Sequence, residues 1–110
     1  MRLRHCIVVS ILSACVCFAH ADSTAVQSKQ HVVTIENMQF APQKLTVRRG
    51  DRIVWMNKDL FPHTVTAVSK AFDSGAIQAQ ARWAYVANTP GEYAYVCTYH
   101  PTMQAVLIVD

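Results

Sequence analysis

The sequence predicts an all-β domain, either a sandwich or a barrel of short strands. Runs in which apolar and polar residues alternate recur about every eight to twelve positions, and turn-forming residues separate them. The expected strands cover residues 31–35, 44–48, 52–57, 63–68, 80–87, 92–97 and 104–109. A chain of 110 residues is long enough for one such domain only.

The alternation also predicts which side chains face the core. Tyr93, Tyr95 and Cys97 share one face of their strand, so the thiol points where large aromatic rings point. By the same spacing, two further sets share inner faces: Ile53, Trp55 and Asn57, and Trp83, Tyr85 and Ala87.

Two segments have competing interpretations. Residues 76–87 contain five alanines and would tolerate a helix, but the aromatic and β-branched residues near their end favour a strand. Arg49-Gly50-Asp51 spells an adhesion tripeptide, yet it lies between two alternating runs. We interpret it as a hairpin turn that uses the freedom of glycine at positive φ.

The first 21 residues have the pattern of a secretory signal peptide. Two arginines precede a run of 13 mostly apolar residues, 6–18, and Ala19-His20-Ala21 forms a cleavage site of the small-x-small type. The apolar run is shorter than the roughly 20 residues that span a bilayer as a helix. We therefore predict export to the periplasm, a flexible tail at 22–30 and a folded domain at 31–110.

A rival cleavage site lies within the same segment. Leu12-Ser13-Ala14-Cys15 resembles a bacterial lipobox, in which Cys15 would carry a lipid anchor. The apolar residues 16–18 follow it, whereas a polar tether usually follows a lipidated cysteine. Cleavage after Ala21, giving a soluble exported protein without a membrane span, is the favoured reading.

Charge and cysteine content narrow the function classes. Cleavage after Ala21 leaves eight basic and seven acidic residues, and this balance gives no basic face for nucleic acid. It also removes three of the four cysteines, so Cys97 remains alone and no internal disulfide can form. A small exported domain without disulfides often depends on a metal, and a lone thiol in that setting is a liability or a ligand.

The segment from Cys97 to Met103 carries the chemistry. It places a thiol, an imidazole and a thioether at Cys97, His100 and Met103, and His63 could supply a fourth donor from another strand. Two imidazoles, one thiolate and a weak axial thioether form the ligand set of a blue-copper electron-transfer centre. Zinc can also bind cysteine and histidine, but its sites seldom use a thioether.

Several motifs resemble those of the cupredoxins and, within that family, of the amicyanins. The motifs are Val47-Arg48-Arg49-Gly50-Asp51, Ile53-Val54-Trp55-Met56-Asn57, Pro62-His63, Gly91-Glu92-Tyr93-Ala94-Tyr95-Val96-Cys97 and the short loop from Cys97 to Met103. The resemblance covers nearly all of the chain after the leader. It implies a Greek-key sandwich of about eight strands with one type 1 copper ion at one end.

The resemblance also implies a role for each site residue. His63, Cys97 and His100 would be the strong copper ligands, and Met103 would be the long axial one. Asn57 would brace the cysteine loop near Thr98 and hold the loop of His63. Tyr99 stands where the family has proline, so its backbone N–H could donate to the sulfur, and we expect Tyr99→Pro to lower the reduction potential.

The function implied is that of a monomeric periplasmic carrier of single electrons. By resemblance, its donor would be a dehydrogenase and its acceptor a cytochrome. The alternatives are a protein that sequesters or delivers copper, and a metal-free structural module. Four protein ligands leave no open coordination position for a substrate, so the sequence does not predict an enzyme.

Overall fold

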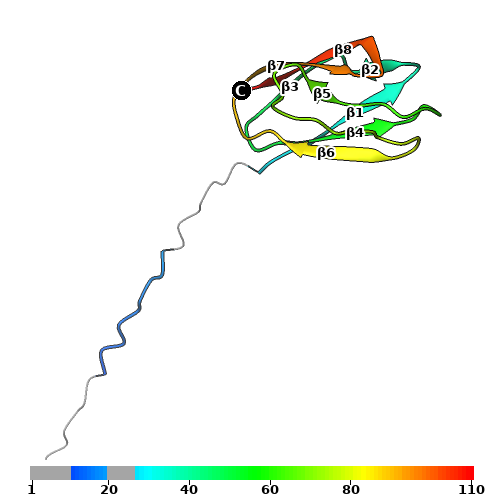
Figure 1. Ribbon diagram of the computed structural model, residues 1–110. Helices are drawn as coiled ribbons and strands as arrows, with labels where there is room; N and C mark the ends of the chain where they lie inside the picture. The colour runs from blue at the N-terminus through cyan, green and yellow to red at the C-terminus, as the bar shows by residue number, and fades with distance from the viewer. Residues whose placement is uncertain (1–10, 20–26) are drawn as a thin grey trace, which may run out of the picture.

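The computed structural model describes residues 11–19 and 27–110, and the domain that it shows is built from β-strands (Figure 1). None of the described residues is helical. The eight strands are β1 (Gln30–Glu36), β2 (Gln39–Ala41), β3 (Lys44–Val47), β4 (Arg52–Asn57), β5 (Thr66–Ala67), β6 (Arg82–Val86), β7 (Gly91–Cys97) and β8 (His100–Val109). The predicted all-β fold is confirmed.

The strands form two four-stranded sheets, in the orders β2-β1-β4-β6 and β3-β8-β7-β5. Two pairs are parallel, β1 with β4 and β3 with β8, and the other pairs are antiparallel. Parallel neighbours from one short domain require connections that cross between the sheets, as in a Greek key. Strands β1, β4 and β7 end, and β8 begins, at the same end of the sandwich, opposite the C-terminus (Figure 1).

The expected strands match most of the observed ones, with three main differences. The last strand begins at His100 rather than at residue 104, because Cys97 pairs with His100 and most of the predicted ligand loop is part of the hairpin of β7 and β8. The predicted strand 63–68 is reduced to the two residues of β5, because the side chain of Ser74 accepts the Val65 N–H and a turn supplies the other partners. The short strand β2 was not predicted. It follows a tight turn in which Asn37 and Met38 have φ of 54° and 59°, and a methionine in that region gives no turn signal.

The predicted hairpin at Arg49-Gly50-Asp51 was wrong. The segment is a turn, with Gly50 at φ 93° and the Asp51 N–H bonded to the Arg48 carbonyl at 3.0 Å. The strands on either side of it, however, belong to different sheets, because β3 pairs with β8 and β4 pairs with β1. The turn therefore carries the chain from one sheet to the other.

The core lies between the two sheets and contains most of the side chains that the alternation placed there, whereas Trp83, Tyr85 and Tyr93 are half-buried and pack against it. Ile53, Trp55 and Asn57 are fully buried, as is Cys97. Trp55 packs against the rings of Trp83, Tyr95 and Phe72, with centroids 5.4, 5.7 and 6.1 Å away. Its Nε1–H donates to Tyr95 Oη at 3.2 Å, and burial raises the pKa of Tyr95 to about 12.

At the end of the sandwich where β4 begins, Asp51 connects the start of β1 to its own turn. Its carboxylate accepts the N–H of Lys29 at 2.9 Å and that of Arg48 at 3.0 Å, and it pairs with His31 Nε2 at 2.9 Å. The Lys29 bond ties down the end of the segment predicted as a flexible tail, and β1 begins at Gln30. The hydrogen bonds from Lys29, His31 and Arg48 lower the pKa of Asp51 to about 2.

We expect Asp51→Asn to destabilise the fold at neutral pH and to flatten its acid sensitivity. The folded-state pKa of about 2 lies below the ordinary value of 3.8, so the stabilisation is present above about pH 4. It is lost as the pH falls from about 4 towards 2. Urea unfolding between pH 2 and 7 measures this, and equal pH slopes for both proteins would contradict it.

Only part of the predicted leader lies within the described residues. Residues 1–10 and 20–26, which include the start of the signal and part of the cleavage site, lie outside them. No helix among the described residues is long and apolar enough to cross a membrane. Cys15 and Cys17 are exposed free thiols, and Cys97 is a buried one.

Candidate metal centre

The end of β7 and the loop before β5 bring Cys97 and His63 together. Both side chains are fully buried, and Cys97 Sγ lies 3.7 Å from His63 Nδ1. Bonds of about 2.3 Å to sulfur and 2.0 Å to nitrogen, the lengths found at zinc, would place such atoms roughly 3.5–3.7 Å apart when they meet at tetrahedral or trigonal angles. The pair therefore has the separation of two ligands of one ion.

The other two predicted ligands, Met103 and His100, both lie on β8. Met103 is 4% exposed and belongs to the same buried cluster as Cys97. His100 is exposed, and its ring centroid lies 6.0 Å from that of His63. Within residues 11–19 and 27–110, no three His, Cys, Asp or Glu side chains group closely enough to hold a metal, so the structure does not bring the predicted ligand His100 together with His63 and Cys97. His63, Cys97 and Met103 are arranged as in a type 1 copper site.

Asp59, which the sequence analysis did not single out, fixes the orientation of His63. Its Oδ2 lies 2.8 Å from His63 Nε2, which leaves Nδ1 turned towards the sulfur. Asp59 also accepts the N–H groups of Asn37 at 2.7 Å and Met38 at 3.0 Å. Burial raises the pKa of Asp59, but the hydrogen bonds from Met38, His63 and Asn37 outweigh it and lower the pKa overall.

Asn57 holds the loop of His63 as expected, but it does not brace Thr98. Its Nδ2 donates to the carbonyls of Phe61 at 2.7 Å and Ile77 at 3.0 Å, and its Oδ1 accepts the Asp59 N–H at 3.0 Å. The amide therefore joins its own loop to the segment of Ile77. The predicted contact with Thr98 is therefore corrected.

Thr64 makes the contacts that the sequence analysis gave to Asn57 and Tyr99. Its Oγ1 accepts the Thr98 N–H at 2.8 Å, and its own N–H lies 3.4 Å from Cys97 Sγ. Of the backbone groups in residues 27–110, this N–H is the one that the structure places on the sulfur. Cys97 pairs with His100 across the hairpin, so Tyr99 lies in the two-residue turn with half of its surface exposed.

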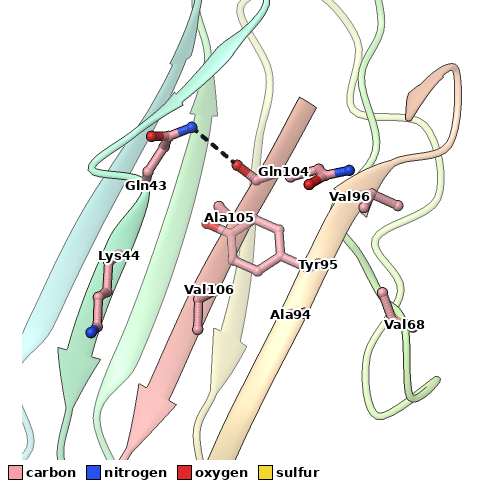
Figure 2. Close-up of a pocket in the computed structure, with 9 residues that line it drawn as sticks. All are labelled: Gln43, Lys44, Val68, Ala94, Tyr95, Val96, Gln104, Ala105 and Val106. Carbon is pink, nitrogen blue, oxygen red and sulfur yellow. Dashed lines mark hydrogen bonds between the residues drawn. The ribbon is translucent and has the colours of Figure 1, made fainter. Parts of the chain in front are cut away.

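A separate hollow of about 450 Å³ lies on the outer face of the second sheet (Figure 2). Strands β3, β7 and β8 line it, and Gln43 Nε2 lies 3.5 Å from the Gln104 carbonyl at one side. Its lining includes none of the predicted site residues. The candidate metal centre lies at the end of the sandwich and is distinct from this hollow.

Fold and site together define a cupredoxin, and a comparison with protein families agrees. The model of the cupredoxin-like domain matches residues 7–109, so the chain belongs to this family. Among its relatives, the chain is similar to amicyanins. It is 31% identical to amicyanin of Paracoccus versutus over 72% of the chain and 64% of that protein, and 28% identical to amicyanin-alpha of Methylorubrum extorquens over 71% of the chain and 70% of that protein.

Solved structures show the same likeness. The copper(I) form of an amicyanin variant superimposes with a TM-score of 0.70 at 27% identity, over 78% of this chain and 87% of that one. A copper-containing nitrite reductase from Thermus scotoductus shares the fold, with a TM-score of 0.68 at 23% identity, over 72% of this chain and 22% of that chain. The chain spans less than two thirds of the length of the Paracoccus versutus relative.

Removing the carboxylate of Asp59 is expected to weaken copper binding by about 10–100-fold, the usual cost of losing a partner that orients a metal-bound histidine. In Asp59→Ala the imidazole of His63 loses the bond that turns Nδ1 inward. Competition with a copper chelator measures the affinity. Glu36→Ala, at an exposed carboxylate at the end of β1, serves as the control, and equal affinities for the two variants would contradict the role of Asp59.

Proposed function

We propose that the protein is a periplasmic carrier of single electrons whose one copper ion alternates between Cu(II) and Cu(I). His63, Cys97 and His100 would bind the ion strongly, and Met103 would bind it weakly along the axis. The observation that carries the proposal is the buried contact of 3.7 Å between Cys97 Sγ and His63 Nδ1. Copper held by this donor set supplies one-electron chemistry in an arrangement that suits both oxidation states.

The surrounding residues support that chemistry by holding the donors still. Asp59 fixes the ring of His63, Thr64 fixes the sulfur of Cys97, and buried Met103 keeps water from that side of the site. Outer contacts of this kind fix ligand orientation and tune the metal. A site held in one geometry needs little rearrangement when an electron arrives.

The surface around His100 suits brief contact with redox partners. Leu60, Phe61 and Tyr99 are 82%, 62% and 51% exposed, and Pro62 and Pro101 are also exposed. Electron-transfer encounters use small interfaces, below about 1,200 Å², and a few exposed apolar side chains can form one. We propose a monomer that docks here with a dehydrogenase as donor and a cytochrome as acceptor, without a catalytic reaction of its own.

Titration of the purified protein with Cu(II) tests the proposal. We expect intense blue colour at one copper per chain that bleaches reversibly with one electron. The alternative, copper sequestration or delivery, predicts that Cu(I) passes readily to an acceptor protein or chelator. A colourless complex would overturn the type 1 site, and rapid loss of copper on reduction would overturn the carrier.

Export can be tested separately. Expression with the full leader in a bacterium, followed by mass spectrometry of the periplasmic fraction, should give a chain that begins at Asp22. A chain that begins at a lipidated Cys15 and sediments with membranes would contradict soluble export, and it would leave the copper chemistry untouched.

A further inference from the structure

A line of hydroxyl groups connects Thr98, in the turn after Cys97, to the carboxylate of Asp73, in the segment that follows β5. Thr98 Oγ1 lies 3.1 Å from Thr64 Oγ1, which lies 3.0 Å from Thr66 Oγ1, which lies 3.1 Å from Asp73 Oδ1. Thr64 and Thr66 are only 3% and 5% exposed. The two central hydroxyls are thus a buried, connected network, and Thr98 and Asp73 at its ends are exposed.

The donors of this line follow from the geometry at Thr66. Its hydroxyl is the donor at both of its contacts, so its one hydrogen is shared between Asp73 Oδ1 and Thr64 Oγ1. The lone pairs of Thr64 Oγ1 accept from Thr66 and from the Thr98 N–H at 2.8 Å. The hydrogen of Thr64 is then left for Thr98 Oγ1 at 3.1 Å.

The segment that carries Asp73 is itself fixed to the strand of Thr66. Thr66 and Asp73 form an isolated β-bridge, and the Ser74 N–H donates to the Val65 carbonyl at 2.9 Å. Asp73 Oδ1 also accepts the Gly75 N–H at 3.0 Å. The carboxylate is therefore held in place independently of the residues that bind the metal.

From this network we propose that Asp73 and Thr66 are positioning residues for the thiolate of Cys97, and the proposal rests on the copper site proposed above. The line of hydroxyls holds the side chain of Thr64 from two sides, and this keeps the Thr64 N–H on Cys97 Sγ. Hydrogen bonding at the cysteine sulfur tunes the potential of such a site. A bond there draws electron density from sulfur, which favours Cu(I) and raises the potential.

The test compares variants that differ only in the line of hydroxyls. Thr66→Val removes the hydroxyl at nearly constant shape, and Thr66→Ser restores it. Asp73→Ala removes the acceptor, and Asp73→Asn is its reference because both lack the charge while asparagine keeps an acceptor oxygen. We expect the reduction potential of Thr66→Val to be lower than that of Thr66→Ser. We likewise expect the reduction potential of Asp73→Ala to be lower than that of Asp73→Asn. When Thr66→Val is also present, the Asp73→Ala and Asp73→Asn proteins should have the same reduction potential.

Ser69→Ala, on the same connection between β5 and β6 but outside the line, is the control and should keep the wild-type potential. Equal potentials for the valine and serine variants at Thr66 would overturn the proposal. The proposal would also be overturned if Asp73→Ala and Asp73→Asn still differed in potential when combined with Thr66→Val. Circular dichroism confirms that each variant is folded.

Hydrogen exchange in the apoprotein separates this inference from the proposed function. Thr66→Val should speed exchange of the Thr64 amide by about tenfold relative to Thr66→Ser, and equal rates would count against the positioning role even if copper binds. If the wild-type protein forms no blue centre, the proposed copper function is refuted. The exchange rates would still show whether Thr66 holds the Thr64 amide in place.

Discussion

Replacing Cys97 by serine is expected to abolish the blue colour and the reversible one-electron couple of the copper-loaded protein. The thiolate is the soft donor of the set, whereas a serine hydroxyl is hard and stays protonated. Copper affinity should fall by at least the roughly 10–100-fold that loss of an outer-shell partner causes. The fold should persist, because the serine oxygen is small enough for the buried site and can still accept the Thr64 N–H.

Met103→Leu is the matched comparison for Cys97→Ser. Both residues are buried, but the thioether is the weak axial donor, so the leucine variant should keep its colour and change mainly its potential. Absorption spectra and voltammetry of the two variants provide the measurement. Blue colour in Cys97→Ser would show that the thiol is not a ligand.

The candidate ligands could be predicted from the sequence more readily than the residues that orient them. Cys97, His100 and Met103 are neighbours along the chain, and strand alternation alone directs Cys97 into the core. The structure places His63 against that thiol, as the resemblance implied. Residues that lie close in sequence, or that repeat with a fixed period, can be placed without knowledge of the loops.

The outer contacts could not be placed in this way because they join distant segments. Thr64 meets the cysteine loop 33 and 34 positions away, and Asp59 reaches back 22 positions to Asn37. Nothing in the local pattern shows which of the polar residues around His63 will face Thr98. The family resemblance gave that role to Asn57, and in this chain a threonine beside the histidine has it instead.

Some strand boundaries and pairings were predicted wrongly for a related reason. β5 is short because side chains and turns, rather than a neighbouring strand, satisfy much of the backbone around Val65. The Arg49-Gly50-Asp51 turn was taken for a hairpin because adjacent runs usually pair. The two parallel pairings, β1 with β4 and β3 with β8, depend on contacts between strands far apart in the chain.

Trp55→Ala is expected to cause the largest loss of stability, about 3–5 kcal/mol. The indole is fully buried and contacts three other rings, and its N–H is the partner of Tyr95 Oη. A loss of this size is a large part of the roughly 5–15 kcal/mol that stabilises a domain, and it would lower Tm by more than about 12 °C. Guanidinium unfolding of the apoprotein, followed by far-ultraviolet circular dichroism, measures the effect.

Two further substitutions divide that loss into its parts. Trp83→Ala removes the same side chain from a half-buried position on β6, so it should cost clearly less than Trp55→Ala. Trp55→Phe keeps most of the buried apolar surface and removes the hydrogen bond to Tyr95, and it should cost about 1–3 kcal/mol. Equal costs at Trp55 and Trp83 would mean that the core is not centred on the contact between β4 and β7, because Trp55 is the tryptophan that packs against Tyr95 across the two sheets.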